Sequence, residues 1–393
     1  MISGQNIVFF GDDWGRHVSS SQHLIRRFAS HNRVLWVNTF GMRPPSLSLS
    51  DLRRSVQKIA GWISPAVAQP NLPKNMTLIS IFGLPYYSVP AIRRMNAQLS
   101  RTTVLNAIYN QKLTDPIVIT SLPTTVDLVG KLGERAFIYY CVDEFTHYPG
   151  LPSRIITEME KELLSKADLV IVTSSELQKR KQGNQREVRL IPHGVDVDHF
   201  AQALELRNTV PAPMVGIRRP IIGFLGLLSD WVDLSLLVRM AQLTKHWSWV
   251  FVGATACNTA DLKRLRALPN VFILGKVDYK HIPEYVACFD VGVIPFEVSE
   301  LTVNVNPLKL LEYFACGLPV VSTPLPEVMR YQDLVFIADT PEAFVQAIEC
   351  AMAKNSAELQ QQRMLLAASA SWESRAEDFA RLVEERLQEK AYA

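Results

Sequence analysis

Long apolar runs are absent from this sequence of 393 residues. No stretch reaches the roughly 18 apolar residues that a membrane-spanning helix needs, and the first apolar segment, Ile7–Phe10, is too short for a signal peptide. The five cysteines show no C-x-x-C pairing, which fits free thiols in a reducing compartment. We therefore expect a cytoplasmic protein, possibly peripheral on the inner face of the plasma membrane.

Acidic residues are scarce in the first part of the chain. Between Trp14 and Thr114 there are 13 Lys or Arg and a single acid, Asp51. From Ala201 to the end, 18 basic residues stand against 22 acidic ones. This uneven distribution predicts an anionic partner for the first part: a phosphate, a nucleic acid or an anionic membrane surface.

Short β-branched runs alternate with longer amphipathic segments along the whole chain. This pattern is typical of parallel βαβ units whose strands are buried on both faces. A stretch with the Pro and Gly of a linker lies at 201–219. The expected fold class is α/β, with two Rossmann-like doubly wound parallel sheets facing a cleft. The expected domains are an acceptor-binding one at 1–205, a nucleotide-sugar-binding one at 206–370, and a C-terminal helix at 371–393 that crosses back.

Strand and helix positions follow from the same pattern. We expect strands at 7–10, 34–37, 117–120, 137–142, 169–173, 221–225, 249–252, 271–274, 291–294, 319–322 and 335–337. We expect helices at 19–31, 124–132, 155–166, 234–244, 282–287, 308–315, 341–353 and 372–388.

A helix that begins at Pro307 carries the most informative side chains. Pro is favoured at a first helical position, and the unpaired N–H groups of a helix N-terminus suit a phosphate. Lys309 and Glu312 are three residues apart, so they share one helix face. This face can present an ammonium to phosphates and a carboxylate to ribose hydroxyls. The alternative interpretation is an ordinary Lys–Glu pair on the surface.

Several segments together resemble the GT-B glycosyltransferases of group 1, also called family 4. The strongest is the helix with its Glu, followed by Gly, Pro and a Val-Val-Ser strand. The segments that carry the resemblance are Asn306–Glu312, Cys316–Ser322, Ile191–Asp196 with Phe200, Ile221–Leu234, Asn270–Val277 and Asp290–Pro295. Residues 140–147 resemble a loop of bacterial exopolysaccharide relatives.

The resemblance implies a donor site for a nucleotide-sugar, UDP- or GDP-linked, with no cofactor. Glu312 would bind the ribose and the backbone near Val277 the base. The backbone that would lie at the sugar and phosphates is that of Asn306, Pro307 and Leu308. Gly226 and Asn304 are further candidates for donor contacts.

Two departures from the family pattern bear on this site. Retaining members carry a second acid where this chain has Asn304. The loop that begins at Gly226 lacks the usual basic residues. We therefore expect Lys309 to supply the charge for the phosphates.

The candidate catalytic groups follow two other strands. Asp143, Glu144 and His147 follow the strand at 137–142, and Asp143 is the predicted base or acceptor-orienting group. A helix-capping Asp is the equally weighted alternative. Asp13 follows the first strand, close to Arg16. No D-x-D pair stands where a strand would end in the cleft, so we expect a mechanism without a metal.

Basic and aromatic residues of the first part suggest an acceptor or membrane surface, although a merely solvated face is the alternative. The resemblance favours a lipid-linked saccharide acceptor in polysaccharide assembly, and no nucleic-acid motif is visible. The candidate residues for this surface are Arg16, Arg53, Arg54, Lys58, Trp62, Arg93 and Arg94.

Two rival functions stay open at this point. A sugar-nucleotide epimerase of the same fold would convert the donor without an acceptor. A non-catalytic nucleotide-sugar-binding protein would bind the donor without turnover, which the loss of an acid at Asn304 allows. A dehydrogenase is disfavoured because no G-x-G-x-x-G follows either first strand.

Overall fold

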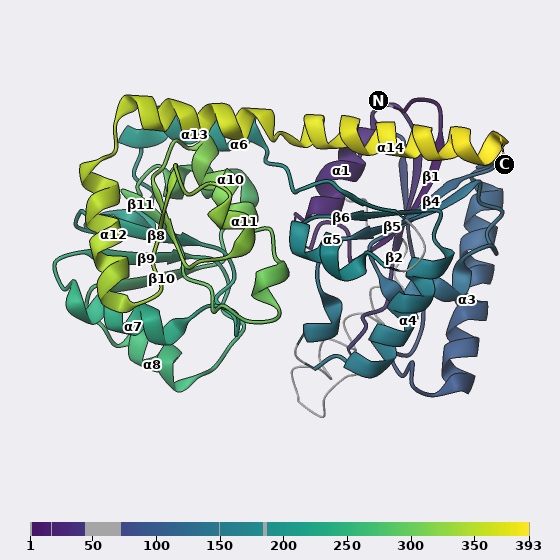
Figure 1. Cartoon of the computed structure of the whole chain (residues 1–393), viewed down its shortest axis with the longest axis horizontal. Coiled ribbons are helices and arrows are strands. Elements are labelled where there is room, and N and C mark those ends of the chain that lie inside the picture. The colour runs from purple at the N-terminus through teal and green to yellow at the C-terminus, as the bar shows by residue number, and fades with distance from the viewer. Residues whose placement is uncertain (1, 17, 44–71, 149, 184–186, 393) are drawn as a thin grey trace. The chain divides into compact units, whose positions relative to one another are not determined.

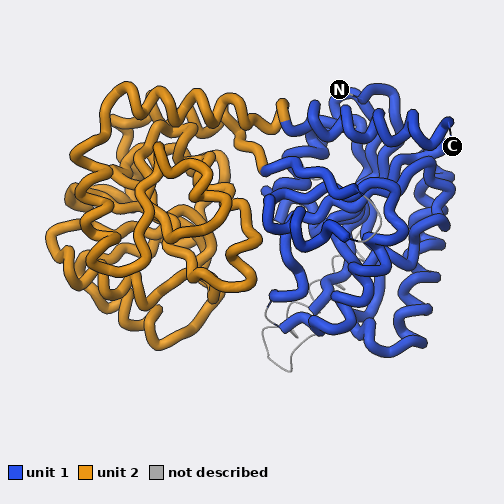
Figure 2. The backbone as a smooth tube through the Cα atoms, viewed as in Figure 1, with its two compact units in different colours: residues 1–192, 375–393 blue, residues 193–374 orange. Residues whose placement is uncertain are grey.

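The computed structural model describes residues 2–16, 18–43, 72–148, 150–183 and 187–392. The chain divides into two units, each built on a parallel sheet with helices packed against it (Figure 1). Unit 1 comprises residues 1–192 and 375–393, and unit 2 comprises residues 193–374 (Figure 2).

The sheet of unit 1 has seven parallel strands in the order β3-β2-β1-β4-β5-β6-β7. Its strands are β1 (Asn6–Gly11), β2 (Arg33–Asn38), β3 (Met76–Ser80), β4 (Ile117–Thr120), β5 (Ala136–Cys141), β6 (Leu169–Val172) and β7 (Val188–Leu190). The helices are α1 (Ser20–Ala29), α3 (Pro90–Asn110), α4 (Ser153–Lys166) and α5 (Ser175–Lys181), with 3-10 turns η1 (Pro123–Leu128) and η2 (Phe145–His147).

Both faces of this sheet are covered. On β1, Ile7 and Phe9 belong to one hydrophobic cluster, whereas Val8 and Phe10 belong to another. Successive side chains of a strand point to opposite faces, so the two clusters lie on the two sides of the sheet. On one side the helix α14 (Trp372–Tyr392) contributes Phe379, which packs edge-on against Phe28 and Tyr140.

The sheet of unit 2 has six parallel strands in the order β10-β9-β8-β11-β12-β13. Its strands are β8 (Ile221–Leu225), β9 (Ser248–Val252), β10 (Val271–Gly275), β11 (Val291–Ile294), β12 (Val320–Ser322) and β13 (Val335–Ile337). Its helices are α6 (Val197–Ala201), α7 (Leu234–Leu243), α8 (Ala260–Arg266), α9 (Ile282–Val286), α10 (Leu308–Ala315), α11 (Pro326–Met329), α12 (Pro341–Ala353) and α13 (Ala357–Ser369). The 3-10 turns are η3 (Gln202–Asn208), η4 (Ala212–Met214), η5 (Tyr279–His281) and η6 (Thr302–Asn304).

The predicted fold class of two doubly wound parallel sheets is confirmed. The boundary lies at 192/193 rather than at 205/206, because Val195, Phe200 and Ala203 pack into the core of unit 2. The helix predicted at 124–132 is only the 3-10 turn η1. Within the described ranges, no helix combines the length and the hydrophobicity needed to cross a bilayer.

Each sheet has a point where the strand order reverses. In unit 1 this point lies between β1 and β4, and in unit 2 between β8 and β11. The loops that leave neighbouring strands there run to opposite faces, which opens a crevice at the carboxyl ends of the strands. Ligands of open α/β sheets bind in this crevice, so it is the first place to look for a site in each unit.

A buried ionic cluster holds the loop after β5 to the helices of unit 1. The Lys181 ammonium at the end of α5 lies 2.9 Å from Glu144 Oε2 and 2.6 Å from Glu160 Oε2. Tyr139 Oη donates to Glu160 Oε1 at 2.7 Å. Burial acts to raise the pKa of Glu144, but Lys181 and other donors outweigh it and hold that pKa below its ordinary value.

This cluster corrects the prediction for Glu144. The side chain is 2% exposed and engaged with Lys181 and Thr146, so it cannot reach a substrate. Its role is to fix the loop that begins with Asp143.

We expect Lys181→Met to lower the free energy of unfolding of unit 1 by about 3–5 kcal/mol at neutral pH, because two carboxylates stay buried without their cation. Below the ordinary Glu pKa the loss should shrink, since the carboxylates then become protonated in both states. Lys179→Met on the same helix is the control; its exposed pair with Glu176 should be worth at most about 0.5 kcal/mol. Equal losses for the two variants in denaturant unfolding would contradict the assignment.

Candidate active site

Lys309 lies at the point where the strand order of unit 2 reverses. Gly226 directly follows β8, and Phe296 follows β11 on the other side of the point where the strand order reverses. Lys309, in the first turn of α10, places its ammonium 5.9 Å from the ring centre of Phe224 and 5.8 Å from that of Phe296. The sequence placed Gly226 and Lys309 in one site, and the structure brings them into contact.

Glycine is required at position 226 for two reasons. Its φ of +136° is rarely adopted by other residues. A Cβ there would also lie 2.6 Å from Lys309 Nζ. A second glycine, Gly253 after β9, has a φ of +150°, and a Cβ on it would overlap the carbonyl of Gly226. The backbone at Gly253 therefore lies close to the backbone at Gly226, beside the Lys309 ammonium.

Within the described part of the chain no carboxylate forms a salt bridge with Lys309, although Glu312 is close enough to act on its charge. Burial lowers the pKa of Lys309, and Glu312 opposes this effect. Burial likewise raises the pKa of Glu312, and Lys309 opposes it. Because the effect of burial is opposed only by Glu312, which forms no salt bridge with Lys309, this position favours an anionic ligand.

The N-terminus of α10 adds further positive potential. Its N-cap is Pro307, which makes no side-chain capping hydrogen bond, and its first turn contains no acidic residue. The first N–H groups of the helix thus have no side-chain cap, and they lie beside Lys309. The helix end and the ammonium together form a site suited to phosphate.

The position of α10 is fixed by a hydrogen bond that the sequence did not predict. The Leu225 N–H donates to Tyr313 Oη at 2.8 Å, and Tyr313 is fully buried. This bond ties the helix that carries Lys309 and Glu312 to the strand that ends at Gly226. A Tyr in an apolar helix face gives no sequence signal for such a role.

Asn304, another predicted donor contact, lies in the loop before α10. It is 1% exposed, and its Nδ2 donates to the carbonyl oxygen of Glu300 at 2.6 Å. This bond holds the loop before α10. The other predicted donor residues surround the start of α10 or follow β10: Asn306, Pro307, Leu308 and Val277.

Asp143 follows β5 in unit 1 and is hydrogen-bonded to Tyr148. Burial raises the pKa of Asp143 to about 6, although the Tyr148 bond acts in the opposite direction. A carboxylate with such a pKa is ionised at neutral pH and basic enough to accept a proton. Tyr148 is a site residue that the sequence missed, because only the turn of the loop brings it back to Asp143.

Two other predicted catalytic groups have polar partners nearby. Arg180 Nη1 lies 2.9 Å from His147 Nε2. Because a guanidinium can only donate, Nε2 must accept, and His147 cannot use that atom as a base. Asp13 lies in the loop after β1, at the strand-order reversal of unit 1, and 3.7 Å from Arg16 Nη1.

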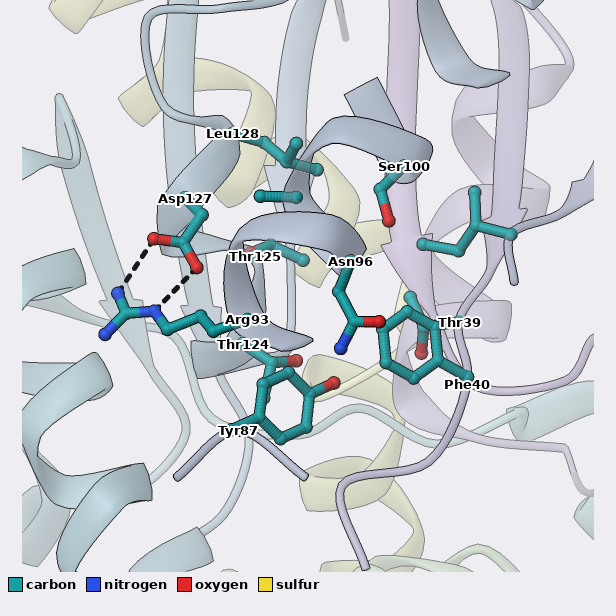
Figure 3. Close-up of a pocket in the computed structure, with 12 residues that line it drawn as sticks. Thr39, Phe40, Tyr87, Arg93, Asn96, Ser100, Thr124, Thr125, Asp127 and Leu128 are labelled. Atoms are coloured by element: carbon teal, nitrogen blue, oxygen red, sulfur yellow. Dashed lines mark hydrogen bonds and ion pairs between the residues drawn. The ribbon is translucent and has the colours of Figure 1, made fainter. Parts of the chain in front are cut away.

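The structure describes only some residues of the predicted acceptor or membrane surface. Arg93 Nε and Nη2 each lie 2.8 Å from a carboxylate oxygen of Asp127 (Figure 3). Arg93 Nη2 also lies 2.9 Å from Glu162 Oε2. Its charge is therefore paired within unit 1. Arg94 and Arg16 are exposed. The remaining candidates, Arg53, Arg54, Lys58 and Trp62, lie outside the described residues.

A cavity beside Arg93 is too small for a sugar. It is lined by Tyr87, Asn96, Ser100 and Thr125, among others (Figure 3). Its volume of about 20 Å³ is enough for one water molecule. The amide of Asn96 is already bonded to both the N–H and the carbonyl of Leu84, so this cavity is part of the packing of unit 1.

Known proteins resemble this chain in sequence and in fold. Residues 219–354 match the family model for glycosyl transferases of group 1. A Bacillus subtilis (strain 168) protein named as a teichuronic acid biosynthesis glycosyltransferase, TuaH, is 27% identical over 229 residues. That match covers 56% of this chain and 57% of TuaH, so the chain spans little more than half the length of this relative.

Two solved structures share the fold at low identity. Anabaena Alr3699/HepE, in complex with UDP and glucose, has a TM-score of 0.68 at 13% identity and covers 96% of this chain and 99% of its own. The α,α-trehalose 6-phosphate synthase of Burkholderia multivorans has a TM-score of 0.66 at 11% identity, with coverage of 100% and 98%. Residues 219–354 of unit 2 thus match the glycosyl transferases of group 1, and the two doubly wound sheets share the fold of these solved structures.

Proposed function

We propose that this protein transfers a sugar from a nucleotide-sugar donor to a saccharide acceptor. The observation that carries the proposal is the Lys309 ammonium, which forms no salt bridge among the described residues and lies beside Gly226 and the start of α10. Unit 2 binds the donor, and unit 1 supplies the group that acts on the acceptor.

The donor is recognised through its diphosphate, ribose and base. Lys309 and the first N–H groups of α10 meet the diphosphate. Glu312 accepts hydrogen bonds from ribose hydroxyls, and the backbone near Val277 meets the base. A UDP- or GDP-sugar fits these partners, and the complex of HepE with UDP and glucose supports the uridine form.

The charge that develops on the leaving diphosphate is stabilised by the protein itself. In the transition state the bond between the anomeric carbon and the β-phosphate oxygen breaks, and negative charge grows on that oxygen. A buried ammonium next to a helix N-terminus is preorganised for this charge, so we propose a reaction that needs no metal ion.

The acceptor hydroxyl is activated or oriented by Asp143. Its oxygen forms the new bond to the anomeric carbon, and its proton passes to the Asp143 carboxylate. Tyr148 orients that carboxylate, and the Lys181 cluster holds the loop in place. The name of TuaH, a teichuronic acid biosynthesis glycosyltransferase, supports a role in polysaccharide assembly, and we propose that the acceptor is a lipid-linked saccharide at the inner membrane face.

The proposal is tested first by thermal shift of the purified chain with a panel of nucleotide-sugars and free nucleotides. We expect stabilisation by a UDP- or GDP-sugar, followed by transfer to a lipid-linked saccharide that persists in a metal chelator. Binding without transfer to any acceptor would favour a non-catalytic role, and conversion of the donor alone would favour an epimerase.

We expect Lys309→Met to weaken donor binding about tenfold or more, because the diphosphate loses a charge-assisted partner in a desolvated place. Lys354→Met removes the same charge from an exposed position of unit 2 and serves as the control. Isothermal titration of the donor measures both. A change of less than about twofold for Lys309→Met would remove this residue from the site.

We expect Asp143→Asn to reduce turnover more than about tenfold while the donor affinity stays unchanged, because the amide can still bond Tyr148 but cannot take a proton. Asp198→Asn, an exposed change in unit 2, is the matched control. Turnover above a tenth of the wild-type value would show that Asp143 is not the base.

The acidic limb of the pH profile gives an independent test of the same group. The pKa of Asp143 is raised to about 6, so kcat/KM should fall about tenfold per pH unit below pH 6 as the carboxylate becomes protonated. The Asp143→Asn protein should lack this limb. A wild-type profile that stays flat from pH 7 to about pH 5 would contradict the assigned base.

A further inference from the structure

Exposed apolar side chains gather at the start of α3 in unit 1. Leu84, Tyr86, Val89, Met95 and Leu99 are each between 37% and 42% exposed. Single exposed apolar residues are common, but a run of five within a short stretch of chain is a sign of an interaction surface. The Asn96 amide bonds the backbone of Leu84, which holds the segment before α3 against the helix.

A basic groove lies next to these residues. It has a volume of about 700 Å³ and is lined by α3 and by the segment around Asp127 and Lys131. Its exposed cations are Arg94, Arg101 and Lys131, and none of them forms a salt bridge within the described part of the chain. The carboxylate of Asp127 is already used by Arg93.

The spacing on α3 places both features on its exposed side. Arg94 and Arg101 are seven residues apart and share one side of the helix, while Met95 and Leu99 are four apart and occupy the neighbouring side. Asp and Glu are absent from the sequence between residues 52 and 114. The helix thus offers cations and apolar groups together, with no acid of its own.

We propose that this α3 surface, made of Leu84, Tyr86, Val89, Met95, Leu99, Arg94, Arg101 and Lys131, docks on an anionic lipid bilayer. The apolar side chains enter the boundary between headgroups and acyl chains, and the cations bind lipid phosphates. A membrane fits better than a nucleic acid because four of the five apolar side chains are aliphatic and cannot stack on bases. The proposal rests on the proposed function only in that a lipid-linked acceptor would be met at such a surface.

The test is flotation of the full chain with vesicles of phosphatidylglycerol and phosphatidylcholine, compared with phosphatidylcholine alone. We expect binding to the anionic vesicles at moderate salt, and the variant Arg94→Gln/Arg101→Gln should bind about tenfold or more weakly. Lys263→Gln/Arg266→Gln removes the same charge from exposed positions of α8 and should bind nearly as the wild type does. Equal weakening by the two double variants would overturn the surface assignment.

A second variant tests the apolar part and separates this proposal from the proposed function. Met95→Ser/Leu99→Ser should lose vesicle binding although it keeps every cation, and it should still transfer sugar to a soluble acceptor. Unchanged vesicle binding by this variant would overturn the bilayer proposal. So would equal binding to neutral vesicles, or displacement by soluble RNA with no response to the apolar change. A wild-type chain that binds vesicles but transfers no sugar would refute the function and leave the surface standing.

Discussion

The close approach of the Lys309 side chain to Gly226 is the constraint on which the proposed donor site depends. A lysine can lie there only because position 226 lacks a side chain and because the rings of Phe224 and Phe296 flank the ammonium. The bond from Leu225 to Tyr313 keeps α10 at the required distance. Without an anion the arrangement leaves a desolvated cation, and with a diphosphate it becomes complete.

In unit 1, unlike at Lys309, two basic side chains each form salt bridges with two acids. Lys181 forms salt bridges with Glu144 and Glu160, and Arg93 forms salt bridges with Asp127 and Glu162. These compensated groups fix loops and helices and have no charge left for a ligand. What remains is Asp143, whose pKa is raised by burial, and the exposed cations of α3. The proposed functional groups are thus ones that form no salt bridge among the described residues.

Much of the fold could be predicted because each strand is a short apolar run that ends in polar residues. The predicted strands 117–120, 221–225, 291–294 and 335–337 coincide with β4, β8, β11 and β13. The edge strands β3 and β7 were not predicted, because they are less buried and carry polar residues. The boundary was misplaced for a related reason: Pro and Gly marked a surface loop, while the packing of Phe200 decided where unit 2 begins.

The sequence by itself determined the order of elements, the glycines and Pro307 at their turns, and the pairing of Lys309 with Glu312 on one helix face. These features follow from local conformational preference and periodicity, which a linear pattern carries. Which charged groups are already paired within the protein became clear only from the folded structure. Glu144, Arg93 and Asn304 looked like functional residues, yet partners distant in sequence or a buried loop engage them. Whether a charge is compensated depends on those partners and on burial, so the sequence pattern could not separate Asp143 from Glu144.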